Sequence, residues 1–196
     1  MDACRKCRKF GAKLFLKGER CVTPKCSFTR RNYPPGSHGG KKTMRRKSEY
    51  GLQLAEKQKA KAEYGLRERN FSKIFRLASR SRENTGEELL RLLEMRLDTI
   101  VYRLGWAASL KQARQLVGHR KFKINEKMVN IPSKVLQEKD KITPVKKEAI
   151  SPNKVTLPKW LKADAKNMIA EVLRLPAHQE IESDLDEQLI IEFYSR

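Results

Sequence analysis

Four cysteines near the start of the chain have a spacing that suits a metal ion: Cys4-x2-Cys7-x13-Cys21-x4-Cys26. Two close pairs of thiolates separated by a connector are the ligand pattern of a tetrahedral zinc site, in which each pair occupies a tight turn. Lysines and arginines lie between these cysteines. Their charge lowers thiolate pKa values and offsets the double negative charge of a four-thiolate zinc centre. The spacing therefore predicts a zinc knuckle that binds one Zn²⁺ through four thiolates.

Two other chemistries use four cysteines, namely a pair of disulfides and an iron–sulfur cluster. Disulfides need an oxidising compartment, and no apolar leader follows Met1 that would direct the chain there. The disulfide alternative is therefore disfavoured. Metal analysis separates zinc from an iron–sulfur cluster.

Charge points to a polyanionic partner. The chain of 196 residues carries a formal net charge of +21, with 39% apolar and 34% charged residues. This length supports one or two domains with a modest core. This net positive charge is larger than solubility requires, so RNA, DNA or an anionic membrane surface is the expected partner. No run of 18 apolar residues occurs, so no membrane span is predicted. Residues 177–196 reverse the sign and are acidic.

The elements that must position these charges begin with a basic arm. Residues 26–47 contain Pro34, Pro35 and several glycines, followed by a run of lysines and arginines. This composition predicts an arm that becomes ordered on its partner. Strong helix formers then predict a helix over 49–64, and apolar residues at helical spacing predict another over 68–80.

The clearest helical pattern runs from Thr85, which with Glu88 forms a capping-box pattern, to a stop at Gly105. Ser109 and Gln112 repeat the capping pattern for a shorter helix. One face of that helix is polar, and side chains three or four residues apart on it can span successive phosphates. The alternative is a polar face that is merely solvated.

After residue 119 the pattern alternates, which predicts short strands around a turn at Asn125 and Glu126 and another strand over 142–145. A helix is expected over 160–172 and a strand over 189–193. The predicted fold class is α+β: a zinc knuckle, a helical region, and two helices packed on a small antiparallel sheet. The expected domains are 1–48 (knuckle and arm), 49–95 completed by 146–196 (helical), and 96–145 (two helices and sheet).

Several blocks of sequence resemble one family over almost the whole chain, in the family's order. They are KLFLKGERC (13–21), YPPGSHG (33–39), YGLQLAEKQKAKAEYG (50–65), LLRLLEMRLDTIVYRLG (89–105), ARQLVGH (113–119), VNIPS (129–133) and LIIEFYSR (189–196). Together they resemble the bacterial small-subunit ribosomal protein conventionally numbered four, in its form with a zinc knuckle. Residues 96–145 look like the RNA-binding module named after that family.

The resemblance implies a structural protein, not an enzyme, in the small ribosomal subunit of the cytoplasm. Members of the family bind small-subunit ribosomal RNA early in assembly and clasp a junction of several helices. The resemblance also implies neighbours, namely small-subunit proteins three and five and messenger RNA near its entry channel. It further implies an influence on the accuracy of translation, and some members repress their own message. No membrane or small-molecule partner is expected.

Two other functions stay open at this point. The same module occurs in RNA-modifying enzymes, and Arg96-Leu97-Asp98-Thr99 superficially resembles the stretch around a pseudouridine synthase aspartate. Asp98 lies inside an apolar helical pattern, however, so an ion pair or cap is the expected role. The second alternative is a zinc-dependent DNA-binding regulator.

The residues predicted to contact RNA carry a cationic, imidazole or amide side chain and fall in two segments. In the knuckle and arm they are Arg5, Lys6, Arg8, Lys9, Arg30, Arg31, His38, Lys41, Lys42, Arg45, Arg46 and Lys47; in the module they are Lys111, Arg114, Gln115, His119, Arg120 and Lys121. No catalytic residue is predicted.

The chain departs from the family at one turn. Many members have glycine after the asparagine of the module's hairpin, and here Glu126 occupies that position. A type I′ turn needs positive φ at both central residues, so Asn125-Glu126 predicts either strain or a different loop. Some members of the family also lack the cysteines, which implies that their fold persists without metal.

Overall fold

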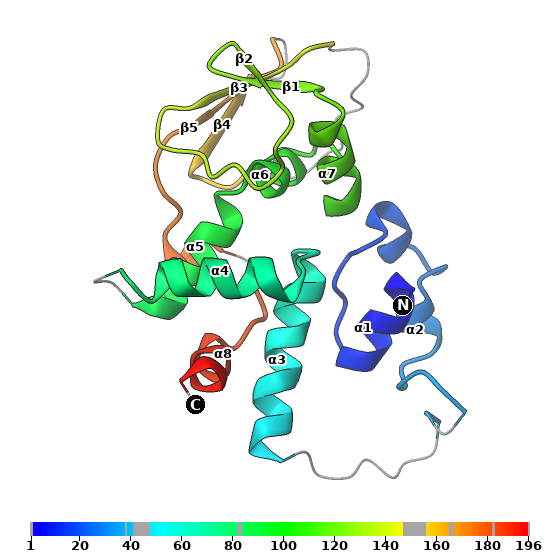
Figure 1. Ribbon diagram of the computed structural model, residues 1–196. Coiled ribbons are helices and arrows are strands. Elements are labelled where there is room, and N and C mark those ends of the chain that lie inside the picture. Colours follow the sequence, from blue (N-terminus) through cyan, green and yellow to red (C-terminus); the bar gives the residue numbers. More distant parts are fainter. Residues whose placement is uncertain are drawn as a thin grey trace. The chain divides into compact units, whose positions relative to one another are not determined.

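A computed structural model describes residues 2–37, 39–40, 48–81, 84–146, 156–164, 167–181 and 183–195. The chain divides into two compact units, drawn in Figure 1. Unit 1 comprises residues 1–72 and 184–196, and unit 2 comprises residues 73–183. The expected combination of helices with an antiparallel sheet is confirmed. None of the helices in the described segments is both long and apolar enough to span a membrane.

Unit 1 is helical. It contains α1 (Ala3–Phe10), a 3-10 turn η1 (Gly18–Cys21), α2 (Ser27–Arg30), α3 (Glu49–Glu63), the first part of α4 (Glu68–Ala78) and α8 (Glu187–Tyr194). The two central helices agree with the prediction. The side chain of Ser48 caps α3 by accepting a hydrogen bond from the backbone N–H of Gly51 at 3.2 Å, which satisfies a donor that the first helical turn leaves unpaired.

The described part of unit 2 combines the second part of α4 and three further helices with a sheet. The helices are α5 (Thr85–Glu94), α6 (Leu97–Arg103) and α7 (Leu110–Gly118), followed later by a 3-10 turn η3 (His178–Glu180). The strands are β1 (Phe122–Ile124), β2 (Lys127–Val129), β3 (Lys141–Pro144), β4 (Leu161–Asp164) and β5 (Ile169–Val172). Ser109 caps α7 by accepting from the N–H of Gln112 at 3.3 Å, which confirms the predicted start of that helix.

The helix expected from residue 85 to 105 is interrupted at Arg96. The backbone of Arg96 is extended and forms a bridge with Val135. The N–H of Leu97 donates to the carbonyl of Lys134 at 2.8 Å, and the N–H of Leu136 donates to the carbonyl of Met95 at 2.9 Å. These bonds replace the helical bonds lost at the break. Gly105, with φ of +72°, lies just past the end of α6, where the stop was predicted.

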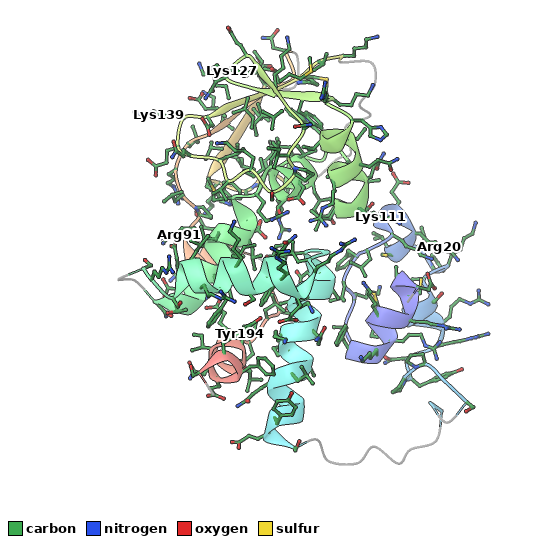
Figure 2. All side chains as sticks on the ribbon, in the orientation of Figure 1. Arg20, Arg91, Lys111, Lys127, Lys139 and Tyr194 are labelled. Carbon is green, nitrogen blue, oxygen red and sulfur yellow. The ribbon has the colours of Figure 1, made fainter. Side chains whose placement is uncertain are left out.

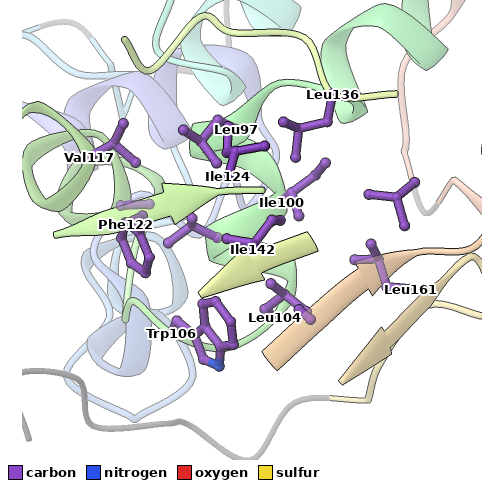
Figure 3. Close-up of a cluster of buried hydrophobic side chains, with 14 of the residues drawn as sticks. Leu97, Ile100, Leu104, Trp106, Val117, Phe122, Ile124, Leu136, Ile142 and Leu161 are labelled. Carbon is purple, nitrogen blue, oxygen red and sulfur yellow. The ribbon is translucent and has the colours of Figure 1, made fainter. Parts of the chain in front are cut away.

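All neighbouring strands of the sheet are antiparallel, in the order β2-β1-β3-β5-β4. Phe122 lies opposite Val129 on one side and Pro144 on the other, so these side chains share a face. Helices α6 and α7 pack on that face, and Figure 3 shows the resulting core. The rings of Trp106 and Phe122 stack there with centroids 5.9 Å apart.

The segment after residue 145 differs from the prediction. Residues 160–172 were expected to form a helix, but they form β4 and β5, which join the sheet through pairing of β5 with β3. Leu161 and Val172 lie opposite each other and are buried, whereas Lys162 and Glu171 lie on the other face. This alternation suits a half-buried sheet. Strands β4 and β5 therefore continue the sheet and belong to unit 2.

The last element is helix α8, although a strand was expected over 189–193. Asp186 caps it by accepting from the N–H of Leu189 at 3.2 Å. The helix packs along α3, and Ile190 is buried in the contact. Helix α8 therefore belongs to unit 1, together with α3.

The hairpin between β1 and β2 keeps a two-residue loop despite Glu126. Asn125 has φ of +47° and Glu126 has φ of +67°. Positive φ at both positions is the geometry of a type I′ turn. The Asn125 side-chain oxygen accepts from the N–H of Lys141 at 2.9 Å, and its amide donates to Asp140 at 2.7 Å. These bonds anchor the loop to the start of β3, while Glu126 keeps a side chain in the left-handed region.

Candidate nucleic-acid interface

Three polar side chains lie in a row along the outer face of α7 and at its C-cap. Lys111, Gln115 and His119 are four residues apart and all three are exposed. That spacing brings side chains together on one helix surface. Figure 2 shows Lys111 at this helix. Gln112 is used differently, because its side-chain oxygen accepts from the N–H of Ala108 at 2.8 Å and completes the cap.

Arg120 and Lys121 follow directly in the loop that leads to β1. Arg120 is exposed and has φ of +56°, while Lys121 is half-buried. The structure therefore brings the predicted RNA-contact residues of the module together at α7 and its C-terminal loop. Unit 2 also has exposed lysines that were not predicted, among them Lys127, Lys134, Lys139 and Lys141. Lys127 and Lys139 are labelled in Figure 2.

Arg114 is also on α7, but Asp98 of α6 engages its guanidinium. The Nε and Nη2 atoms of Arg114 donate to Oδ2 of Asp98 at 3.0 and 2.7 Å. Arg96 donates to the same carboxylate from Nε at 3.0 Å and Nη2 at 2.9 Å. Asp98 is fully buried, and the expected ion-pair role of this aspartate is confirmed. Arg114 was predicted to contact RNA and not to pair with Asp98. The sequence does show an acidic residue, Asp98, among apolar helical positions. A buried carboxylate of this kind requires a nearby cation.

The predicted basic residues of unit 1 surround α1 and α2. Arg5, Lys9, Arg30 and Arg31 are exposed, and Lys6 is half-buried. Helices α1 and α2 are in contact, so these side chains belong to one small subdomain. The predicted His38, Lys41, Lys42, Arg45, Arg46 and Lys47 lie outside the described residues.

Arg8 has a second role in this segment. Its Nε donates to the carbonyl of Tyr33 at 2.9 Å and its Nη2 to the carbonyl of Pro34 at 3.2 Å. Its guanidinium also lies over the Tyr33 ring, 4.7 Å from the centroid. The side chain therefore holds the chain after α2 against α1.

The four cysteines lie in the described segment 2–37 and are free thiols. Cys7, Cys21 and Cys26 are buried and Cys4 is half-buried. Burial raises the pKa of Cys7, and the nearby Cys21, Cys4 and Cys26 raise that pKa further. The N–H of Thr29, at the start of α2, lowers the pKa of Cys26. The backbone N–H of Lys17 contacts the sulfur of Cys21 at 3.3 Å.

These thiols meet the chemical requirement for zinc, because four soft sulfur donors lie within one short segment. The thiols are not arranged as a metal site. In the described part of the chain, no three His, Cys, Asp or Glu side chains are grouped closely enough to hold a metal ion. The predicted zinc site therefore stays a prediction.

Comparison with known proteins covers both units. The family described as "Ribosomal protein S4/S9 N-terminal domain" matches residues 2–94, and the "S4 domain" matches residues 95–142. The chain is 50% identical over 200 residues to the small ribosomal subunit protein uS4 of Dictyoglomus turgidum, covering 98% of this chain and 96% of that protein. It is 46% identical over 202 residues to the protein of the same name from Caldicellulosiruptor saccharolyticus, with the same coverage of each chain.

Proposed function

The chain belongs to the uS4 family of small ribosomal subunit proteins, and from this premise we propose that it is a structural, RNA-binding constituent of that subunit. The observation that carries the proposal is the row of Lys111 and Gln115 on α7 and His119 at its C-cap, inside the segment that matches the S4 domain. Lysine and amide side chains at helical spacing suit contacts to phosphate and sugar. The net charge of +21 supports the same class of partner.

Affinity in such a protein comes from phosphate contacts, which release counterions from the RNA. Specificity has to come from the shape of the folded RNA, because the major groove of an A-form helix is too narrow for side chains to read. We therefore expect the protein to bind small-subunit ribosomal RNA at a junction of helices, early in assembly, with α7 and the basic surface of α1 and α2 on the backbone.

The proposal excludes catalysis at Asp98. A pseudouridine synthase needs an aspartate that reaches the substrate base, whereas Asp98 is fully buried and bonded to two guanidinium groups. The names of the relatives likewise describe a ribosomal protein. RNA modification by this residue would require the Arg96 and Arg114 contacts to open.

The finer features follow the family resemblance. We propose neighbours among small-subunit proteins three and five, a place near the messenger RNA entry channel, and an influence on translational accuracy. The acidic segment 177–196 fits contact with a protein or solvent better than contact with RNA, because its charge has the same sign as the phosphates.

We also propose that Cys4, Cys7, Cys21 and Cys26 bind one zinc ion. The spacing, the free state of the thiols and the burial of three of them support this. When bound, zinc would supply a cross-link between α1 and the 21–26 segment. This cross-link would fix the position of α1 and of its basic side chains Arg5 and Lys9. Elemental analysis of protein purified in reducing buffer tests this: about one zinc per chain supports it, whereas iron alone, or no metal, contradicts it.

Binding to a transcript of the small-subunit ribosomal RNA of Dictyoglomus turgidum tests the main function. Eight phosphate contacts imply a slope of roughly −6 to −7 in log affinity against log salt concentration. Competition with duplex DNA of equal length distinguishes the DNA-binding alternative, and analysis for modified nucleosides distinguishes the enzyme. Affinity that does not change with salt, preference for the duplex DNA, or the appearance of pseudouridine would contradict the proposal.

A further inference from the structure

The sheet of unit 2 has a second face, opposite the one on which α6 and α7 pack. The packed face carries Phe122, Ile124 and Ile142 (Figure 3). Successive side chains of a strand point to opposite faces, so the residues between and beside these three lie on the second face. We call it the outer sheet face. Its exposed or half-buried side chains include Lys123, Met128, Lys141, Thr143, Lys162 and Glu171.

Lys123 of β1 lies opposite two uncharged residues. Its partners across the sheet are Met128 on β2 and Thr143 on β3. Lys141 is its diagonal neighbour on β3, at a distance of about 7 to 8 Å. Within the described residues, the ammonium groups of Lys123 and Lys141 form neither an ion pair nor a hydrogen bond. Both cations can therefore bind an external anion.

Glu171 of β5 limits the basic part of the outer sheet face. It lies opposite Lys141 on one side and opposite Lys162 of β4 on the other. Opposite charges directly across neighbouring strands attract each other. One carboxylate thus faces two lysines, whereas Lys123 faces no acidic side chain. The positive charge of this face is therefore least compensated on β1, at Lys123.

The β1 end of the outer sheet face is continuous with the row on α7. His119 at the C-cap of α7 is followed by Arg120 and Lys121, and β1 begins at the next residue. The carbonyl of Lys121 accepts from the N–H of Val145 at 2.8 Å, so the pairing of β1 with β3 extends to Lys121. Because Lys121 precedes Lys123 by two residues, both lie on the same side of the sheet.

We propose that the outer sheet face binds RNA phosphates at Lys123, with Lys121 and Lys141 on either side, and so continues the RNA contact of α7. The lysines supply charge, and the Thr143 hydroxyl opposite Lys123 can donate to a phosphate oxygen. An RNA strand that follows α7 would pass Lys121 and reach β1. This inference rests on the proposed RNA-binding function and extends its surface to the second face of the sheet.

Lys123→Gln tests the contact, because it removes the charge and keeps a polar side chain. We expect RNA affinity to fall about fivefold, as for one exposed ionic contact. The slope of log affinity against log salt should become shallower by about 0.7 to 0.9, which corresponds to one phosphate contact. Lys162→Gln is the matched control, since Lys162 is exposed on the same face, beyond Glu171. It changes the net charge equally and should bind as the wild type does.

Filter binding to the Dictyoglomus turgidum small-subunit RNA transcript over a range of salt concentrations measures both quantities, and circular dichroism verifies folding. Lysine acetylation followed by mass spectrometry gives a second readout on the wild-type chain, independent of any variant. The RNA should protect Lys123 and Lys141 from acetylation and leave Lys162 as reactive as in the free protein.

The outcomes separate this inference from the proposed function. If Lys123→Gln and Lys162→Gln bind the transcript equally well, net charge alone acts and the inference is wrong. If Lys123 is acetylated equally with and without RNA, the inference is likewise wrong. In both cases salt-dependent binding by the wild type would keep the RNA-binding function intact. If the wild type shows no salt-dependent binding, the proposed function fails and this inference fails with it.

Discussion

Lys57 of α3 places its ammonium nitrogen 4.0 Å from the ring centroid of Phe193 on α8. The same nitrogen lies 5.5 Å from the Tyr194 ring and donates to Oε1 of Glu68 at 3.0 Å. The Tyr194 hydroxyl donates to that oxygen at 2.9 Å. Lys57 is buried, so a cation, a carboxylate and two rings hold α8 against α3 and the start of α4 within unit 1.

Lys57→Met should loosen this attachment of α8. The methionine retains the apolar length of the side chain but loses the cation–π contact and the bond to Glu68. We expect unit 1 to be destabilised by about 1 to 2 kcal/mol, because the cation is desolvated. Hydrogen exchange of the amides in 187–194 measures the effect. Lys61→Met is the control, since Lys61 binds Glu68 at 2.6 Å. An equal loss of protection in both variants would attribute the effect to Glu68 alone.

The charge of Glu68 should make unit 1 sensitive to acid. Partial burial raises the pKa of Glu68, but hydrogen bonds from Lys61, Lys57 and Tyr194 outweigh it and lower that pKa from 4.5 to about 2. A carboxylate with a lower pKa in the folded state stabilises the fold above pH 4.5, and this contribution is lost as pH falls toward 2. Glu68→Gln should therefore flatten the decline in the free energy of unfolding across this window. A decline as steep as that of the wild type would show that other groups cause it.

Glu126→Gly should stabilise unit 2. Glu126 has φ of +67°, a region in which a side chain is unfavourable and glycine is not. We expect a gain of about 0.5 to 1 kcal/mol in the free energy of unfolding, measured by urea denaturation. Glu126→Ala removes the carboxylate and keeps the Cβ, so it should give no such gain. If alanine stabilised as much as glycine, relief of charge and not of backbone strain would be the cause.

Cys7→Ser should lower the zinc content and loosen residues 2–37 while unit 2 stays folded. Cys7 packs with Leu14 and Ala62 in a cluster made entirely of unit 1 residues. Elemental analysis and hydrogen exchange measure the two effects. Leu14→Ala disturbs the same cluster without removing a thiol, so it should retain its zinc. Full zinc content in Cys7→Ser would contradict the proposed ligand set.

Elements with local signals were predictable from the sequence, and those that depend on distant partners were not. The start of α7 follows from Ser109 and Gln112, which lie within one helical turn. The break at Arg96 depends instead on pairing with Val135, far along the chain. Ile190 and Ile191 are β-branched, which favours a strand. A cap at Asp186 and packing along α3 make this segment a helix.

The candidate interface shows the same division. The exposed row on α7 could be predicted, because side-chain spacing on a helix is fixed by its geometry. The role of Arg114 could not, because the sequence places Asp98 sixteen residues earlier and on a different helix. A cationic side chain on a polar helix face can therefore bind either RNA or a carboxylate within the protein. Only the fold shows which cation has such a carboxylate beside it.

The position of β5 between β3 and β4 has a consequence for synthesis of the chain. Strand β3 ends at Pro144, and its second neighbour begins only at Ile169. A nascent chain that has emerged as far as β3 carries an edge whose N–H and C=O groups still lack their β5 partners. Such edges attract other extended segments and promote aggregation. Translation that pauses before Val172 has emerged would therefore leave the edge of β3 unpaired and make the nascent chain a target for chaperones.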